Sequence, residues 1–177
     1  ESAEEASAVA IDSQGRIVVG GWTNFFGKKM ALARYLADGT IDTTFGSNGF
    51  VIMRPDNPGP GADLTAQPYN DSEIFDLVIG TNDSIVAVGK TRTSLSGTSD
   101  DLVVARFTSS GALDPSFNGT GVVIRDVAIG IDNANAVALD ADGRIVVAGL
   151  SDVSPGPVDT FQMLVAHERA FWPKATD

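Results

Sequence analysis

The sequence contains no cysteine among its 177 residues, and it has no long apolar run. The absence of thiols excludes disulfide bonds, thiolate metal sites and thiol-based catalysis, although it does not fix the compartment. The longest strictly apolar stretches cover four residues, whereas a membrane-spanning helix needs roughly 20. We therefore expect no insertion into a membrane.

Basic residues are scarce, because 12 Lys and Arg stand against 23 Asp and Glu and give a net charge of −11. Such a chain repels polyanions, so nucleic acid is not an expected partner. Histidine is scarcer still: His167 is the only one, which excludes three-histidine metal sites and any Ser-His-Asp arrangement built without it. With 43% hydrophobic and 20% charged residues, the composition is that of a globular domain with a buried core.

What the sequence does contain is an internal repeat. The segment Ala8–Gly21 (AVAIDSQGRIVVGG) returns as Ala136–Gly149 (AVALDADGRIVVAG), and a weaker copy lies at Asp76–Gly89. Three isoleucines stand at the same place in these copies and are 68 and 60 residues apart: Ile17, Ile85 and Ile145. A fixed period of this size is typical of repeat architectures.

A second block follows the first in the same order. Met30–Tyr35 matches Leu102–Phe107, and Gly39–Gly49 matches Gly111–Gly121. In the third unit only Met163–His167 continues this pattern, and the glycine-rich block is missing. The third unit is therefore incomplete.

Each unit shows the pattern of short strands and turns. Mainly apolar runs of four to seven residues, rich in Val and Ile and in places containing glycine, alternate with Gly, Asp and Asn clusters such as Asn48-Gly49. Runs such as Ile17–Val19 are apolar on both alternating faces, which indicates sheets covered on both sides. We predict an all-β repeat protein of antiparallel four-stranded β-propeller blades, with about two and a half to three blades in this chain. A parallel β-helix is the competing architecture, but the hairpin turns favour blades.

These blocks resemble the bacterial delta-60 repeat family, whose unit combines an Asp-Gly-Lys/Arg-Ile-Val-Val-Ala-Gly block, a strand ending in Ala-Arg-Tyr/Phe, and Asp-Gly-x-Leu-Asp-x-x-Phe-Gly. The matching residues are Gly15–Gly21, Ala33–Tyr35, Asp38–Gly46, Ala105–Phe107, Gly111–Phe117 and Gly143–Gly149. The resemblance implies a β-propeller-type fold in secreted or surface-attached bacterial proteins, and it carries no catalytic residues over. The chain departs from the family twice, because the middle unit lacks the Asp-Gly-Arg corner and the third lacks its final block.

The repeats divide the chain into four parts: a first blade at 1–53, an inserted Pro/Gly-rich loop at 54–73, a second blade at 74–133, and an incomplete third blade with a divergent tail at 134–177. The variable loops Thr91–Asp100 and Ser151–Thr160 are expected on one common face. The start, Glu1–Glu5, has no signal-peptide character and indicates a processed or truncated beginning.

Three blades are too few to surround an axis, since propellers use about four to eight. We therefore expect further blades as partners, from the same longer chain, another copy or another subunit.

Candidate site residues are few. No catalytic residue is predicted, because the carboxylates recur in register as turn residues, and His167 aligns with Arg34 and Arg106 at a structural position. No cofactor is expected apart from calcium, for which Asp140 and Asp142 are the candidate ligands, although the later ligands of a calcium loop are missing. A ligand surface is predicted at Trp22, Phe25, Phe26, Asp56 and Tyr69. For Trp22, Phe25 and Phe26 the alternatives are a platform for a sugar and packing between blades.

The sequence thus predicts a non-enzymatic segment that acts through its surfaces. Its role would be structural or interactive, adhesive or scaffolding, at an extracellular or cell-surface location in a bacterium. The alternative is a carbohydrate-binding or carbohydrate-cleaving propeller that uses one loop face, with Trp22 and the insertion as walls and a glycan as partner. Cleavage would need only two carboxylates about 5 to 10 Å apart.

Overall fold

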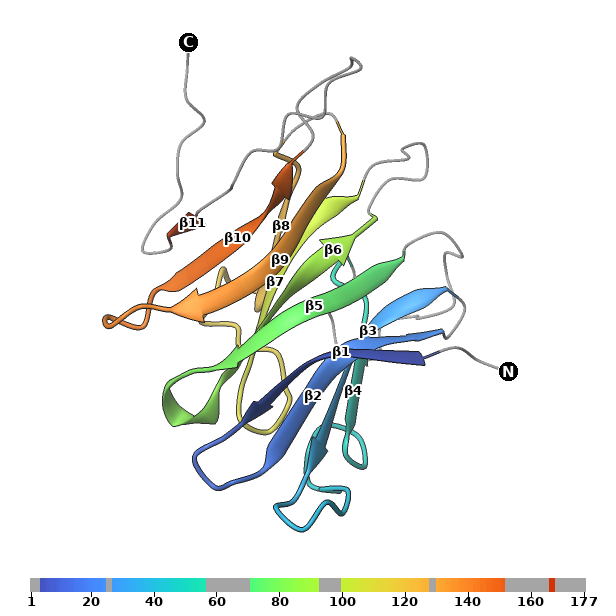
Figure 1. Ribbon diagram of the computed structural model, residues 1–177, viewed down its shortest axis with the longest axis vertical. Coiled ribbons are helices and arrows are strands. Elements are labelled where there is room, and N and C mark those ends of the chain that lie inside the picture. The colour runs from blue at the N-terminus through green and yellow to red at the C-terminus, as the bar shows by residue number, and fades with distance from the viewer. Residues whose placement is uncertain are drawn as a thin grey trace.

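The computed structural model describes residues 4–24, 27–56, 71–92, 100–127 and 130–151, together with the backbone of 166–167. Within these residues the chain forms three antiparallel sheets and one short 3-10 turn, Thr81–Asp83 (Figure 1). No helix in the described part of the chain is long and apolar enough to cross a bilayer. The prediction of an all-β protein built from antiparallel four-stranded blades is confirmed.

Blade 1 is the sheet β1-β2-β3-β4. Its strands are β1 (Glu4–Ile11), β2 (Ile17–Asn24), β3 (Lys28–Tyr35) and β4 (Phe50–Met53). Each strand pairs antiparallel with the next one along the chain, so the sheet is a simple meander.

Blade 2 repeats this meander in the order β5-β6-β7-β8. Its strands are β5 (Ser72–Ile79), β6 (Ile85–Thr91), β7 (Asp101–Phe107) and β8 (Val122–Arg125). The registers agree between the two blades, because Val18 lies opposite Arg34 in the first and Val86 lies opposite Arg106 in the second. The repeat seen in the sequence is therefore a repeat of strand pairing.

Blade 3 is described over three strands: β9 (Asp132–Leu139), β10 (Ile145–Ser151) and β11 (Ala166–His167). Val146 lies opposite His167, just as Val18 lies opposite Arg34. The predicted alignment of His167 with the repeat arginines is confirmed. The first strands of blades 2 and 3 begin at 72 and 132, two residues before the divisions expected at 74 and 134.

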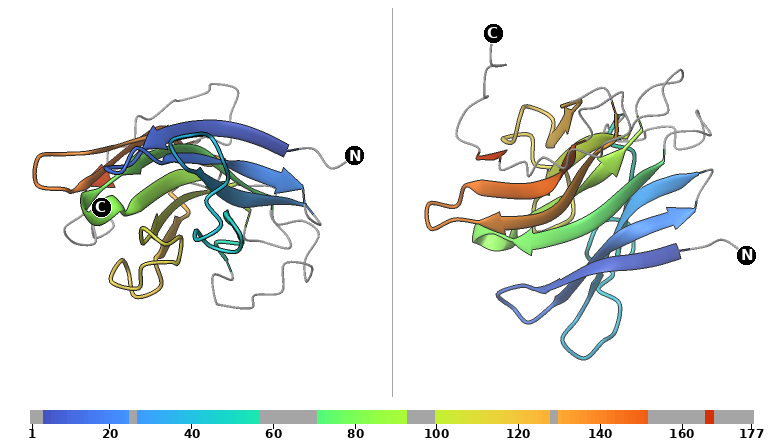
Figure 2. Two further views of the ribbon diagram at one scale, coloured as in Figure 1. Left: turned by 90° about the horizontal axis from the view of Figure 1, so that it is seen from below. Right: turned by 45° about the horizontal axis from the view of Figure 1, so that its top comes forward.

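The three sheets stack face to face with blade 2 in the middle (Figure 2). The first strands β1, β5 and β9 lie next to one another, and the later strands extend away from them (Figure 1). One apolar cluster fills the junction of blades 1 and 2, and a second fills the junction of blades 2 and 3. In β6, Ile85 and Ala87 belong to the first cluster while Val86 and Val88 belong to the second, so this strand is buried on both faces. For the run Ile17–Val19 in β2, the expected cover is present on one side only. Val18 is buried in the first cluster, whereas Ile17 and Val19 are half-buried on the other side of the sheet.

Each blade carries a β-bulge between its first two strands, and a glycine stands opposite it. At these glycines an added Cβ would lie 1.9 Å from a carbonyl oxygen of the first strand, which no side chain can accommodate without moving backbone. The glycines are Gly21, Gly89 and Gly149, opposite the carbonyls of Glu5, Glu73 and Asn133. The glycine that ends each Ile-Val-Val-type run is thus required by the bulge.

The strands β6 and β10 end at the same end of the stack (Figure 1). The loops that follow them, 93–99 and 152–165, lie outside the described residues, so their common face stays a prediction. The insertion is described only at its two edges, up to residue 56 and from residue 71.

Candidate functional site

The repeated Asp-x-x-Gly-Arg corner is a self-contained turn. The Asp12 carboxylate accepts hydrogen bonds from the N–H groups of Gln14 at 2.9 Å and Arg16 at 3.0 Å, and it pairs with Arg16 Nε at 2.6 Å. Asp140 makes the same bonds to Asp142 and Arg144, with Arg144 Nε at 2.5 Å. These recurring carboxylates hold the hairpin turn and neutralise the arginine beside it.

The two candidate calcium ligands share one arginine. Besides its pair with Asp140, Arg144 lies 3.0 Å from a carboxylate oxygen of Asp142. A cation at these two carboxylates would have to displace that guanidinium. Within the described residues, no group of three or more His, Cys, Asp or Glu is placed to hold a metal ion. Calcium binding by Asp140 and Asp142 stays a prediction, and its test is given in the Discussion.

The middle corner departs from the repeat and connects two blades instead. Asn82 and Asp83 adopt left-handed backbone angles, with φ of 58° and 56°, and Asp83 stands where the other two units have glycine. From there the Asp83 carboxylate accepts hydrogen bonds from the N–H and the hydroxyl of Ser13, both at 2.9 Å. Arg16 approaches it at 3.4 Å. These contacts, led by the Ser13 N–H, lower the pKa of Asp83, so its negative charge joins blade 2 to the corner of blade 1.

The second repeated block builds an Arg-Asp-Phe cluster. Arg34 Nε lies 2.8 Å from Asp42, and its guanidinium lies 4.6 Å from the centre of the Phe45 ring. The Thr44 hydroxyl donates a hydrogen bond to Asp42 and, together with the neighbouring contacts, keeps the pKa of Asp42 below its ordinary value. The cluster thus combines an ion pair with a cation–π contact.

Blade 2 contains the same cluster in a more open setting. Arg106 lies 2.8 Å from Asp114 and 4.9 Å from the Phe117 ring centre, and the Ser116 hydroxyl is the first cause of the lowered pKa of Asp114. The Arg106 side chain is nevertheless 27% exposed, whereas that of Arg34 is 4% exposed.

A turn of the next blade accounts for the difference. Arg34 donates a hydrogen bond to the carbonyl of Ser109 in blade 2, and the Gly46 N–H donates to the carbonyl of Ser110 at 2.8 Å. The ion pair and hydrogen bond described for Arg106 both lie within blade 2. Blade 2 therefore covers the cluster of blade 1.

A charged network crosses the other end of the junction between blades 1 and 2. Lys28 Nζ lies 3.0 Å from Glu73, and Lys90 Nζ lies 3.5 Å from Glu73 and 2.9 Å from Asp100. Arg92 also pairs with Asp100 at 2.9 Å. This network, which sequence reasoning missed, bridges the blades at the end where the insertion begins.

The structure describes two of the five predicted ligand-surface residues, Trp22 and Asp56. Trp22 is half-buried, and Lys28 Nζ lies 4.1 Å from the centre of its ring, so one face of the indole is occupied. Asp56 pairs with the buried Arg54 at 2.5 Å and acts electrostatically on the fully buried Lys29, whose pKa is lowered mainly by burial. Phe25, Phe26 and Tyr69 lie outside the described residues.

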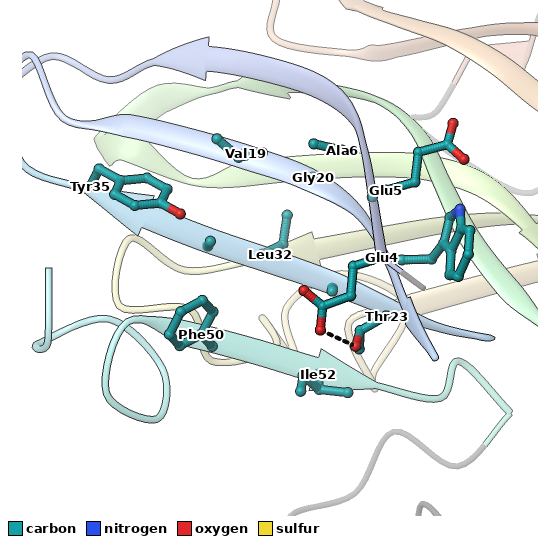
Figure 3. A pocket seen from close by; sticks show the side chains of 14 residues that line it. Glu4, Glu5, Ala6, Val19, Gly20, Thr23, Leu32, Tyr35, Phe50 and Ile52 are labelled. Carbon is teal, nitrogen blue, oxygen red and sulfur yellow. Dashed lines mark hydrogen bonds between the residues drawn. The ribbon is translucent and has the colours of Figure 1, made fainter. Parts of the chain in front are cut away.

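Blade 1 also carries an apolar sheet face with no neighbour among the described residues. A groove of about 270 Å³ runs over this face, and Figure 3 shows Tyr35, Phe50 and Ile52 along it. Val9 and Ile11 of β1 lie opposite Val19 and Ile17 and extend the same face. We call this surface the open face of blade 1, and its main residues are Val9, Ile11, Val19, Ala33, Tyr35, Phe50 and Ile52.

The strand registers give every residue of the open face a counterpart in blade 2. All of these counterparts belong to or pack against the apolar cluster between blades 1 and 2: Leu77, Ile79, Ala87, Ala105, Phe107, Val122 and Ile124. The open face is therefore the copy of a blade-to-blade contact surface.

Comparison with known families agrees with this architecture. A family described as a "Domain of unknown function (DUF5122) beta-propeller" matches residues 13–45 and 81–117. The chain is a propeller-type repeat protein. Both matched stretches begin at the same corner position and end at the phenylalanine of the Arg-Asp-Phe cluster, so they cover the same part of blades 1 and 2. The comparison with curated proteins gave no match for this propeller-type chain.

Proposed function

We propose that this chain is a non-enzymatic structural or interaction segment, adhesive or scaffolding, that works outside a bacterial cell. Its contact surface is the open face of blade 1. The observation that carries the proposal is that this exposed face is made of the same kinds of residues that form a core in blade 2. A contiguous apolar surface of this kind marks a site of association in soluble proteins.

The use of the charged residues supports a structural role. The aspartates and arginines that recur in register form the Asp12–Arg16 and Asp140–Arg144 corners and the clusters around Arg34 and Arg106. Each pair supports a turn or a blade junction. The resemblance to delta-60 repeats, which is finer than the family match, supports the bacterial cell-surface location.

A matched pair of variants tests the proposal in the bacterium that produces the protein. Ile11→Glu places a charge on the open face, and Leu36→Glu makes the same kind of change at an exposed apolar residue just beyond β3. We expect protease treatment of intact cells to remove the wild-type chain and Leu36→Glu from the surface, and Ile11→Glu to be released into the medium. Protection of the wild-type chain inside the cell, or equal retention of both variants, would refute the proposal.

A second candidate function is carbohydrate binding at the same groove. Trp22, Tyr35 and Phe50 are among the residues that line it, and aromatic rings with an open face are the usual platforms for sugars. A glycan array tests this function, with the expectation that Trp22→Ala abolishes any binding while its circular dichroism stays that of the folded chain. Absence of binding, or binding unchanged in Trp22→Ala, excludes it.

A further inference from the structure

The stack ends in two outer sheet faces, one on blade 1 and one on blade 3. At matching register positions, these outer faces carry residues like those of the two sheet faces that meet between blades 1 and 2. The open face of blade 1 copies the side that blade 2 contributes, as described above. At the other end of the stack, the outer face of blade 3 corresponds to the face of blade 1 that packs on blade 2. On that face of blade 1, Ala8 and Ala10 pack against the core and Val18 is buried. The residues at the same register positions in blade 3 are identical: Ala136, Ala138 and Val146.

These three residues of blade 3 are less buried than their counterparts. Ala136 and Ala138 are exposed and Val146 is half-buried within the described chain. We call this surface the outer face of blade 3. The stack therefore ends in two unlike apolar faces, each of which has its complement at the opposite end.

Side-chain sizes agree with a contact between these two faces. In the junction of blades 1 and 2, Gly20 leaves room for Leu77, because a Cβ at Gly20 would lie 2.7 Å from Leu77 Cδ2. The counterpart of Gly20 in blade 3 is Ala148, which is one carbon larger, and the counterpart of Leu77 in blade 1 is Val9, which is one carbon smaller. Blade 3 against blade 1 would thus conserve the volume of the junction, as tolerated core exchanges do.

We propose that a second copy of this chain covers both faces, with the outer face of blade 3 in each copy packed on the open face of blade 1 in the other. Such a contact is head-to-tail, so it either closes into a ring or continues as a filament. Residues 1–177 contribute three blades, so two copies of this stretch supply six and three supply nine. Only six lies within the range of about four to eight blades that propellers use. The proposal rests on one part of the proposed function, namely that the open face of blade 1 is a contact surface, and it names the occupant of that surface.

Charge sets the expected salt dependence of this contact. Each copy carries a net charge of −11, so the two copies repel one another at low ionic strength. The ionic contact that Asp83 makes in the inner junction has no counterpart between copies, because Gly15 stands at that position in blade 1. Added salt should therefore tighten the association.

The first experiment measures the mass of the purified chain in solution by light scattering over a range of concentrations. We expect about 37 kDa, twice the 18.4 kDa of one chain, with no larger species at higher concentration. Ile11→Glu and Ala138→Glu should each give the mass of one chain, whereas Leu36→Glu should remain at the mass of two. All three positions are exposed in the single chain, and circular dichroism checks that each variant folds.

Mixing the two face variants tests the head-to-tail geometry. Ile11→Glu keeps an intact outer face of blade 3, and Ala138→Glu keeps an intact open face of blade 1, so an equimolar mixture retains one of the two contacts. We expect the mixture to recover the mass of two chains at concentrations where each variant alone stays single. A contact of blade 1 with blade 1 would leave Ala138→Glu dimeric and would give no recovery.

Other outcomes overturn the proposal in recognisable ways. A single chain at every concentration shows that no second copy is the occupant, and a mass that keeps growing with concentration shows that the ring does not close. If the pure chain stays single while Ile11→Glu is still released from cells, the proposed function stands and this inference fails. If the chain pairs as expected but Ile11→Glu remains on cells, the inference stands and the proposed function fails.

Discussion

The same sheet face is a core in blade 2 and a surface in blade 1. Leu77 is 5% exposed and its counterpart Val9 is 65% exposed, while Val122 is 5% exposed and its counterpart Phe50 is 47% exposed. The residue types are alike, so the difference comes from the neighbour and not from the strand. In a repeat stack, burial is a property of the place in the stack, because each unit contacts only the units next to it.

The two Arg-Asp-Phe clusters should show the largest difference in stability loss on mutation, because the cluster in blade 1 is covered by blade 2 and the cluster in blade 2 is partly exposed. Arg34→Met leaves the Asp42 carboxylate buried without its cation, which should lower the free energy of unfolding by about 3 to 5 kcal/mol. Arg106→Met removes a pair that water reaches, which should cost about 1 kcal/mol or less. Urea unfolding of the two variants measures both losses. Equal losses would show that the turn of blade 2 does not seal the first cluster.

Truncation of matched apolar residues gives the next contrast. Leu77→Ala removes a buried side chain and should cost about 2 to 5 kcal/mol. Val9→Ala changes an exposed residue and should change the stability of the single chain by less than about 0.5 kcal/mol. The comparison is made in the Ala138→Glu background, which keeps the proposed second copy away. A large loss for Val9→Ala in that background would contradict the exposure of the open face.

The loss of stability on replacing a bulge glycine with alanine should depend on how firmly the neighbouring blades hold the first strand of that blade. Alanine at Gly89 or Gly21 meets a carbonyl oxygen at the same 1.9 Å, so either variant must push the strand away. β5 is held between two blades, whereas β1 has a free side within the described chain, so Gly89→Ala should cost about 1 to 3 kcal/mol and Gly21→Ala less. Melting temperatures of the two variants decide the order, and a reversed order would contradict this difference between the strands.

Acid should weaken the contact that Asp83 makes between blades 1 and 2. Because the pKa of Asp83 is lower in the folded chain than its ordinary value of 3.8, its stabilising contribution is fully present above that value. The contribution is lost as the pH falls through the lower folded value. Asp83→Asn should therefore have a lower melting temperature than the wild type at neutral pH, and the gap should narrow in acid. A gap that does not change with pH would show that the charge of Asp83 is not involved.

The smallest expected effect is that of chelation. Arg144 already neutralises Asp140 and Asp142 from within the same turn, so removal of divalent cations should leave the melting temperature unchanged. A drop after EDTA that calcium restores and magnesium does not would establish the calcium hypothesis. The same measurement on Asp142→Asn would then locate the ion.

Periodicity in the sequence predicted the features that each unit makes within itself. The corners at Asp12 and Asp140 and the pairing of His167 at the position of the repeat arginines follow from local pattern. These features depend on turn chemistry and strand alternation, which act over a few residues.

Contacts between blades could not be predicted from the sequence, because they join residues far apart in the chain. The loss of the Asp-Gly-Arg corner in the middle unit was visible, but the bond from Ser13 to Asp83, 70 residues away, was not. The network of Lys28, Glu73 and Lys90 and the buried Lys29 were likewise not predicted, since each depends on the packing of one blade on another. The role of the bulge glycine at 21, 89 and 149 was not predicted either, although its recurrence in register was visible in the sequence.

The position of blade 2 between two neighbours has a consequence for how the chain loses its structure. In the single chain, blades 1 and 3 each have a neighbouring blade on one face only among the described residues, so thermal fraying should start in them and travel inward. Amide protons of β6 should then be the last to exchange with deuterium, and a protease added to the native chain should cleave blades 1 and 3 before it cleaves this strand.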